Sequence, residues 1–169
     1  MKKLAILAVL AVALPAAANG PLRASLGGYQ EVPAVSTVAM GEFEARVAND
    51  EQSVDWTLVY DGLQADVQQA HIHFAQKSVN GSIIVWLCGS ATNPGPAGTP
   101  ACPQQGTVSG TFTSANVGAS ATTQQLSAGD LASFIDAMES GIAYVNVHTT
   151  ISPGGEIRGQ LTARGESGK

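Results

Sequence analysis

Hydrophobic and polar residues alternate along most of the chain from residue 39 onward. In the segment 39–47, Phe43, Ala45 and Val47 share one side of an extended backbone, opposite Glu42 and Glu44. Such period-two alternation is typical of β-strands with one buried face, because successive side chains point to opposite sides. The pattern predicts strands at 22–29, 39–47, 53–60, 67–75, 82–87, 107–113, 142–148 and 156–163.

One stretch departs from this alternation. Four large hydrophobic residues recur there at i, i+3, i+4 and i+7, which is helical spacing: Leu131, Phe134, Ile135 and Met138. Ser127 and Asp130 precede them as in an N-terminal cap, and Gly141 is suited to end a helix. We therefore expect one short helix before the last two strands. It contains no basic residue, so it is expected to cover the edge or core of the β-fold rather than a membrane.

Turn signals separate the predicted strands. Asn80-Gly81 and Pro153-Gly154-Gly155 are examples, and each favours a tight reversal between neighbouring strands. About eight short strands joined in this way indicate a β-sandwich or barrel. Charged residues make up only 12% of the chain, a low fraction that suits a secreted β-protein better than a helical bundle.

The first 18 residues have the layout of a secretory signal peptide. Lys2 and Lys3 precede an unbroken apolar run at 4–14, and the small residues 16–18 follow. The run is shorter than the roughly 20 residues that a membrane helix needs, and no cysteine follows it for a lipid anchor. We expect cleavage to leave one domain at 19–169, with its core at about 22–163, in the periplasm or outside the cell and without a membrane anchor.

Removal of residues 1–18 would leave six basic residues against thirteen acidic ones. This balance argues against nucleic acid and anionic lipid as partners, because both require a basic surface. The remaining classes of partner are a metal ion and other exported proteins.

Cys88 and Cys102 are the only cysteines. In an oxidising compartment an even pair usually forms a disulfide. The segment between them, 89–101, is rich in proline and glycine, so a bridge would restrain a loop without regular structure. The alternatives are two free thiols, or Cys88 as a soft metal ligand.

The three histidines offer the clearest candidate chemistry. His71 and His73 are two apart in a predicted strand, so both imidazoles project to the same side and can converge on one ion. By the same alternation His148 lies opposite the apolar Val145 and Val147 of a later strand. If the two strands are neighbours, one polar face holds all three histidines.

The same reasoning brings three further polar residues to this face, namely Asn146, Glu156 and Arg158. Glu156 could then serve as a fourth ligand, and all three could orient the imidazoles. The competing interpretation is that this face is simply exposed to solvent, or that the histidines only form hydrogen bonds between strands. Three imidazoles without a thiolate suit copper or zinc. No motif of a known catalytic class is present, and we assign no catalytic residue.

Several segments resemble the CHRD (chordin-type) domain, which is widespread in bacterial exported proteins. They are residues 28–33 (GYQEVP), 70–73 (AHIH), 80–85 (NGSIIV), 144–149 (YVNVHT) and 154–161 (GGEIRGQL). The resemblance runs from about Leu22 to Leu161. It implies an Ig-like or superoxide-dismutase-like Greek-key β-sandwich, and it implies no settled activity.

A looser similarity connects the chain with copper/zinc superoxide dismutase. Two of its features, a His-x-His strand and a later Val-x-His, have counterparts in His71, His73 and His148. Arg158 matches the arginine that guides an anion to copper in that family. The bridging histidine, the zinc ligands and the fourth copper histidine have no counterpart, so this similarity supports copper binding more than dismutation.

Three functions follow from these observations. The first is an exported metal-binding domain, with copper favoured over zinc. The second is an interaction or structural β-sandwich in which the histidines bind nothing. The third is a copper-dependent redox enzyme that uses Arg158 to attract an anionic substrate.

Overall fold

A computed structural model describes residues 20–163, and the predicted signal peptide at 1–18 lies outside this range. The described residues form nine strands, one α-helix and two 3-10 turns, η1 (Gly28–Gln30) and η2 (Ser114–Asn116). The helix α1 spans Leu131–Glu139. The strands are β1 (Leu22–Gly27), β2 (Met40–Val47), β3 (Val54–Asp61), β4 (Val67–Phe74), β5 (Ser82–Gly89), β6 (Gly106–Phe112), β7 (Ala143–Thr149), β8 (Ile157–Gln160) and β9 (Thr162–Ala163).

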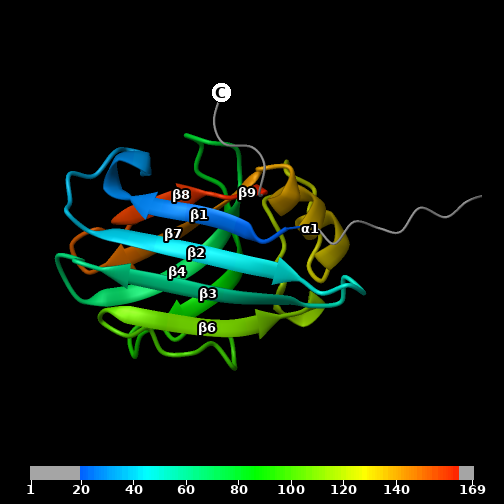
Figure 1. The fold of residues 1–169 in the computed structure, drawn as a ribbon, viewed down its shortest axis with the longest axis horizontal. Helices are drawn as coiled ribbons and strands as arrows, with labels where there is room; N and C mark the ends of the chain where they lie inside the picture. The colour runs from blue at the N-terminus through cyan, green and yellow to red at the C-terminus, as the bar shows by residue number, and fades with distance from the viewer. Residues whose placement is uncertain (1–19, 164–169) are drawn as a thin grey trace, which may run out of the picture.

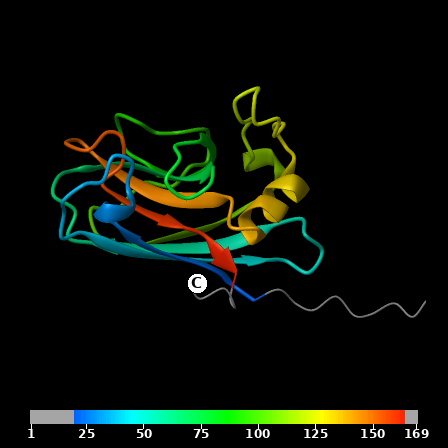
Figure 2. The same cartoon turned by 90° about the horizontal axis from the view of Figure 1, so that it is seen from above.

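All pairs of neighbouring strands are antiparallel, and the strands follow the order β5-β4-β7-β8-β1-β2-β3-β6. This sheet bends over on itself, so that β1, β2, β3 and β6 form one layer and β5, β4, β7 and β8 form the other (Figures 1 and 2). The connections from β3 to β4, from β5 to β6 and from β6 to β7 cross between the layers. The structure therefore confirms the predicted all-β sandwich.

The core between the layers is built from the apolar sides of the predicted strands. In β3 the burial alternates strictly, and Val54, Trp56, Leu58 and Tyr60 are all 5% exposed or less. The facing layer contributes Ala70 and Ile72 of β4 and Val145 of β7, each fully buried. Removal of this apolar surface from water is the main contribution to the stability of the fold.

The strand β7 departs from this alternation, because all seven of its residues are buried. One of its sides faces the core between the layers. The other side carries Tyr144, Asn146 and His148, which are also shielded from water. The outer face of this layer is therefore not a solvent face, contrary to one of the two interpretations that the sequence left open.

The helix lies at one end of the sandwich (Figure 1) and packs against β7 and β9. Its inward side holds the predicted hydrophobic residues, which are buried: Leu131, Phe134, Ile135 and Met138. Asp130 alone caps it, with a side chain that accepts a hydrogen bond from the Ser133 backbone N–H. Ser127 contributes its backbone carbonyl, which accepts from the Asp130 N–H.

The last predicted strand, 156–163, is divided into two in the structure. β8 pairs with β7 on one side and with the end of β1 on the other, whereas β9 pairs with the beginning of β1 alone. Leu161 lies between the two and donates its N–H to the Ala143 carbonyl. β8 and β9 follow β1 in a single register, so the division is a short interruption at Leu161.

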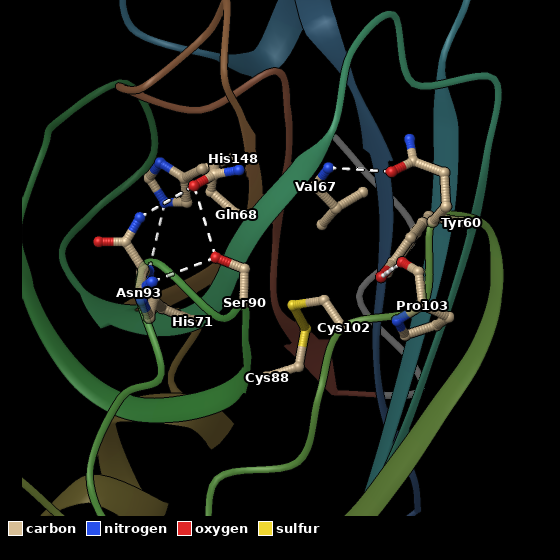
Figure 3. The surroundings of a disulfide bond; sticks show 11 residues. Tyr60, Val67, Gln68, His71, Cys88, Ser90, Asn93, Cys102, Pro103 and His148 are labelled. Atoms are coloured by element: carbon tan, nitrogen blue, oxygen red, sulfur yellow. Dashed lines mark hydrogen bonds between the residues drawn. A yellow bond between two sulfur atoms is a disulfide. The ribbon is translucent and has the colours of Figure 1, made fainter.

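A disulfide joins Cys88, at the end of β5, to Cys102, as the sequence predicts. Around it the loop is held by backbone hydrogen bonds from Gly89 N–H to the Pro100 carbonyl and from Cys102 N–H to the Gly89 carbonyl. Figure 3 shows the disulfide between two groups of hydrogen bonds. On one side the Tyr60 hydroxyl donates to the Pro103 carbonyl, and on the other the side chains of Ser90 and Asn93 donate to Gln68 Oε1. Within residues 20–163, no helix is long and apolar enough to cross a membrane.

The double variant Cys88→Ala/Cys102→Ala is expected to lower the free energy of unfolding by about 3 kcal/mol, because opening a loop of this length releases chain entropy in the unfolded state. The shift in the urea midpoint measures this effect. An unchanged midpoint would show that the bridge does not stabilise the fold.

Candidate metal centre

The pairing of β4 with β7 brings the three histidines together. His71 lies opposite Asn146, His73 opposite Tyr144, and Gln69 opposite His148. Residues that face each other across an antiparallel pair project to the same side of the sheet. All three imidazoles therefore share the outer face of this layer, as strand alternation predicts.

This face is covered by chain segments on its outer side. His71 is fully buried, and His73 and His148 are each 6% exposed. One cover is the loop 75–81, whose Gly81 carbonyl contacts His73 Nδ1 at 3.0 Å. A second is the turn 150–155, whose Pro153 carbonyl contacts His148 Nδ1 at 2.9 Å. Trp86 of β5 covers the site next to His71, and the centroids of these two rings are 4.3 Å apart.

The ring nitrogens are close enough to share one ion. His71 Nδ1 and His148 Nε2 are 3.2 Å apart, and one nitrogen of each of the three rings lies within 4.8 Å of the others. Two nitrogens bound to one tetrahedral ion at about 2.0–2.1 Å are separated by about 3.3 Å. Closing around one ion therefore requires the more distant ring nitrogens, up to 4.8 Å apart, to approach to about 3.3 Å.

The hydrogen bonds fix which nitrogens are free. A carbonyl only accepts, so His73 Nδ1 and His148 Nδ1 carry the protons that bond to Gly81 and Pro153. The Nε2 atoms of both rings then present lone pairs, and that of His148 accepts the hydrogen bond that His71 Nδ1 donates. His73 Nε2 and His71 Nε2 are buried and have no hydrogen-bond partner among the described residues. Each such orphaned atom costs about 1–3 kcal/mol.

The environment keeps these rings neutral. Burial lowers the pKa of His71 to about 2, and the neighbouring His148 and His73 add to the effect. Burial likewise lowers the pKa of His73 to about 4 and lowers that of His148. Neutral imidazole is the form that binds a metal ion, so the site is ready for an ion at neutral pH.

Arg158 and Tyr144 form a stack with His73. The Tyr144 ring is parallel to the His73 ring within 4°, with centroids 4.6 Å apart. The Arg158 guanidinium carbon lies 3.4 Å from the Tyr144 centroid on a cation–π contact. Arg158 is 1% exposed, and its guanidinium donates to Asn80 Oδ1 and to the carbonyls of Gln76 and Val79. It therefore holds the cover 75–81 in place and supports His73 through Tyr144.

Asn146 lies beside the imidazoles, where the sequence places it. Its Oδ1 is 3.0 Å from His148 Nε2, and its backbone pairs with His71 on one side and Arg158 on the other. In the tautomer set by Pro153, His148 Nε2 has no proton, so it and Asn146 Oδ1 both present lone pairs. A cation between them would turn this contact from repulsive to attractive.

The structure does not bring Glu156 to the histidines. Its Oε1 accepts from Thr37 Oγ1 and the Gln64 N–H, and its Oε2 accepts from Thr149 Oγ1. The expectation that it shares the imidazole face is wrong because β8 begins only at Ile157. Glu156 follows Gly155, whose φ of +123° interrupts the alternation. It joins three loops at one end of the sandwich instead.

Glu31 is the residue near the site that sequence reasoning missed. It follows η1 in a loop, and it is 5% exposed. Burial raises the pKa of its carboxyl to about 7, while the Arg158 charge and hydrogen bonds from Val32 and Asn146 oppose the rise. Strand alternation cannot place a loop residue. The only sequence signal is its position in the segment 28–33 that resembles a family motif.

Comparison with known families supports the resemblance seen in the sequence. The sequence model described as the CHRD domain matches residues 22–161. Neither the curated proteins nor the solved structures contain a significant match to the chain.

The stability of the metal-free protein is expected to fall as the pH drops below 6.5. The three histidines have folded-state pKa values below that of a free imidazole, so their contribution is present above pH 6.5 and is lost on acidification. Each contributes a slope of up to about 1.4 kcal/mol per pH unit. Glu31, with a raised pKa, has the opposite effect between pH 7 and 4.5 and offsets one of them.

Urea unfolding between pH 7.5 and 5 in the presence of a chelator measures this slope. The variant His71→Gln should lower it by about the contribution of one histidine. Identical slopes in the two proteins would contradict the burial of a neutral imidazole at this position.

Proposed function

The chain belongs to the CHRD domain family, and we propose that this member is an exported protein that binds one metal ion, copper in preference to zinc, through His71, His73 and His148. The proposal rests on one observation. Three buried imidazoles converge, and two of them have Nε2 atoms without a partner among the residues that the structure describes. Histidines with a purely structural role would direct both ring nitrogens to partners, because an unpaired buried nitrogen destabilises the fold. An ion at the centre of the cluster would supply the missing partner of His73 Nε2 and would bind His71 through one of its two ring nitrogens.

The set of ligands favours copper. It contains nitrogen alone, since the group of convergent ligand side chains in residues 20–163 includes no thiolate and no carboxylate. Imidazole binds both copper and zinc, and the affinity of such sites for divalent ions is higher for copper. The aromatic rings of Trp86 and Tyr144 beside the imidazoles add a polarisable, water-excluding wall. Zinc remains the alternative for the same three ligands.

The enclosure of the site favours holding an ion over reaction with a substrate. A redox enzyme of the kind considered above would present Arg158 to incoming anions. Here the guanidinium is buried, stacked on Tyr144 and engaged by three acceptors. Sequestration or delivery of the ion is therefore the function that we propose.

We propose in addition that the protein is exported. The disulfide between Cys88 and Cys102 suits an oxidising compartment, and residues 1–18 have the layout of a signal peptide. We propose that the mature protein is the single domain 19–169, placed in the periplasm or outside the cell.

Titration of the mature protein with Cu²⁺ and Zn²⁺ tests the proposal. The wild type is expected to bind one equivalent of Cu²⁺, and Cu²⁺ should displace Zn²⁺ in competition. His73→Ala should weaken Cu²⁺ binding by more than about 100-fold, because loss of a ligand exceeds the effect of losing a residue that only orients one.

Glu42→Gln is the matched control for surface binding, since it alters an exposed carboxylate on β2 and should leave the affinity unchanged. Urea unfolding of each variant shows that its fold is intact. Equal and weak binding by the wild type and His73→Ala would exclude the site.

A further inference from the structure

The burial of the three histidines raises the question of how an ion reaches them. The most exposed of them is 6% accessible, so the ion must pass between the segments that cover the site. Two hollows open beside the cluster. One of about 320 Å³ lies between residues 31–35 and the turn 151–155, and one of about 220 Å³ lies beside Arg158.

The two hollows differ in charge. The smaller is lined by Lys77 and Arg158 as well as by Glu31, so two positive side chains oppose one carboxylate there and the net positive charge repels a cation. The larger is lined by neither of these, and its only charged wall residue is Glu31. An incoming metal cation is therefore favoured in the larger hollow.

Glu31 connects the larger hollow with the imidazoles. Its Oε1 is buried and has no hydrogen-bond partner among the described residues, although the hollow reaches the same side chain. Its carboxyl group and the Asn146 side-chain amide both lie against Gly155, and Asn146 Oδ1 is 3.0 Å from His148 Nε2. The Asn146 side chain thus lies between the unpaired oxygen of Glu31 and the imidazole of His148.

The opposite wall of the larger hollow also contacts one of the three histidines. It is the turn 151–155, whose Pro153 carbonyl accepts from His148 Nδ1. A Cβ atom on Gly155 would lie 2.2 Å from Glu31 Oε1, so glycine at this position leaves the carboxylate oxygen unobstructed. The neighbouring Gly154 faces open space, with nothing within 4 Å of an added Cβ.

We infer that the hollow between residues 31–35 and 151–155 is the entrance to the metal centre, and that Glu31 is the carboxylate that receives the cation before the imidazoles bind it. The inference rests on the proposed function, because it concerns the route to the same three histidines. Carboxylate oxygens are common ligands of divalent ions. A negative group at an entrance raises the association rate of a cation by about tenfold or more.

Stopped-flow mixing of the metal-free protein with Cu²⁺ at pH 8 measures this rate. Quenching of tryptophan fluorescence reports binding, since Trp86 lies against His71. Glu31→Gln keeps the shape of the side chain but removes its charge, and it should slow association by about tenfold. Gly154→Leu fills the hollow without a strained backbone, and it should slow association while leaving all three ligands in place.

Two controls separate the entrance from general effects. Glu51→Gln removes the same charge at an exposed turn, and it should leave the rate within twofold of the wild type. Lys77→Met removes a positive charge from the smaller hollow, and it should also have little effect. Because Glu31 lines both hollows, Gly154→Leu and Lys77→Met are the variants that separate them. Faster association in Lys77→Met, together with a wild-type rate in Gly154→Leu, would place the entrance at the smaller hollow and overturn the inference.

The outcomes also distinguish this inference from the proposed function. If the wild type binds Cu²⁺ at equilibrium but Glu31→Gln and Gly154→Leu associate at the wild-type rate, the site stands and the entrance is wrong. If Glu31→Gln weakens the equilibrium affinity without slowing association, Glu31 only supports Asn146 and the inference fails. If the wild type binds no ion, both proposals fail together.

Discussion

The antiparallel pairing of β4 with β7 is the constraint on which the candidate metal centre depends. It sets His71 beside Asn146 and His148, and it sets His73 against Tyr144. The pairing of β7 with β8 then adds Arg158 to the same face. A shift of one of these strands by one residue would turn its own polar side chains toward the hydrophobic core and separate them from those of its neighbour. The hydrophobic packing of Ile72, Val145 and Val147 therefore also fixes the geometry of the site.

The cover over this face gives the imidazoles their chemistry. Arg158 binds the loop 75–81 through two carbonyls and Asn80, and Asn80 Nδ2 in turn donates to the Val32 carbonyl of the loop that carries Glu31. These contacts exclude water and keep the rings neutral. They also leave two imidazole nitrogens unpaired within the described part of the chain. The fold thus maintains a destabilising arrangement of polar groups that a bound cation would relieve at least at His73 Nε2, as expected where stability is sacrificed for a binding site.

The sequence was sufficient to predict the strands, the helix, the disulfide and the shared face of the three histidines, because each depends on a local periodicity or on a pair of like residues. It could not show that this face is buried, since the covering loops have no periodic pattern. Glu156 was misplaced because the alternation was extended one residue beyond the start of β8. Glu31 was missed because its position depends on contacts with Asn146 and Arg158, which are more than 100 residues away in the chain.

The central claim is that one ion is bound by the three imidazoles together. Diffraction data collected on either side of the copper absorption edge, from crystals of the copper-loaded protein, test it most directly. The account predicts one anomalous peak about 2.0–2.1 Å from a ring nitrogen of each of His71, His73 and His148. A peak bound to surface residues alone, with none between the three rings, would contradict it.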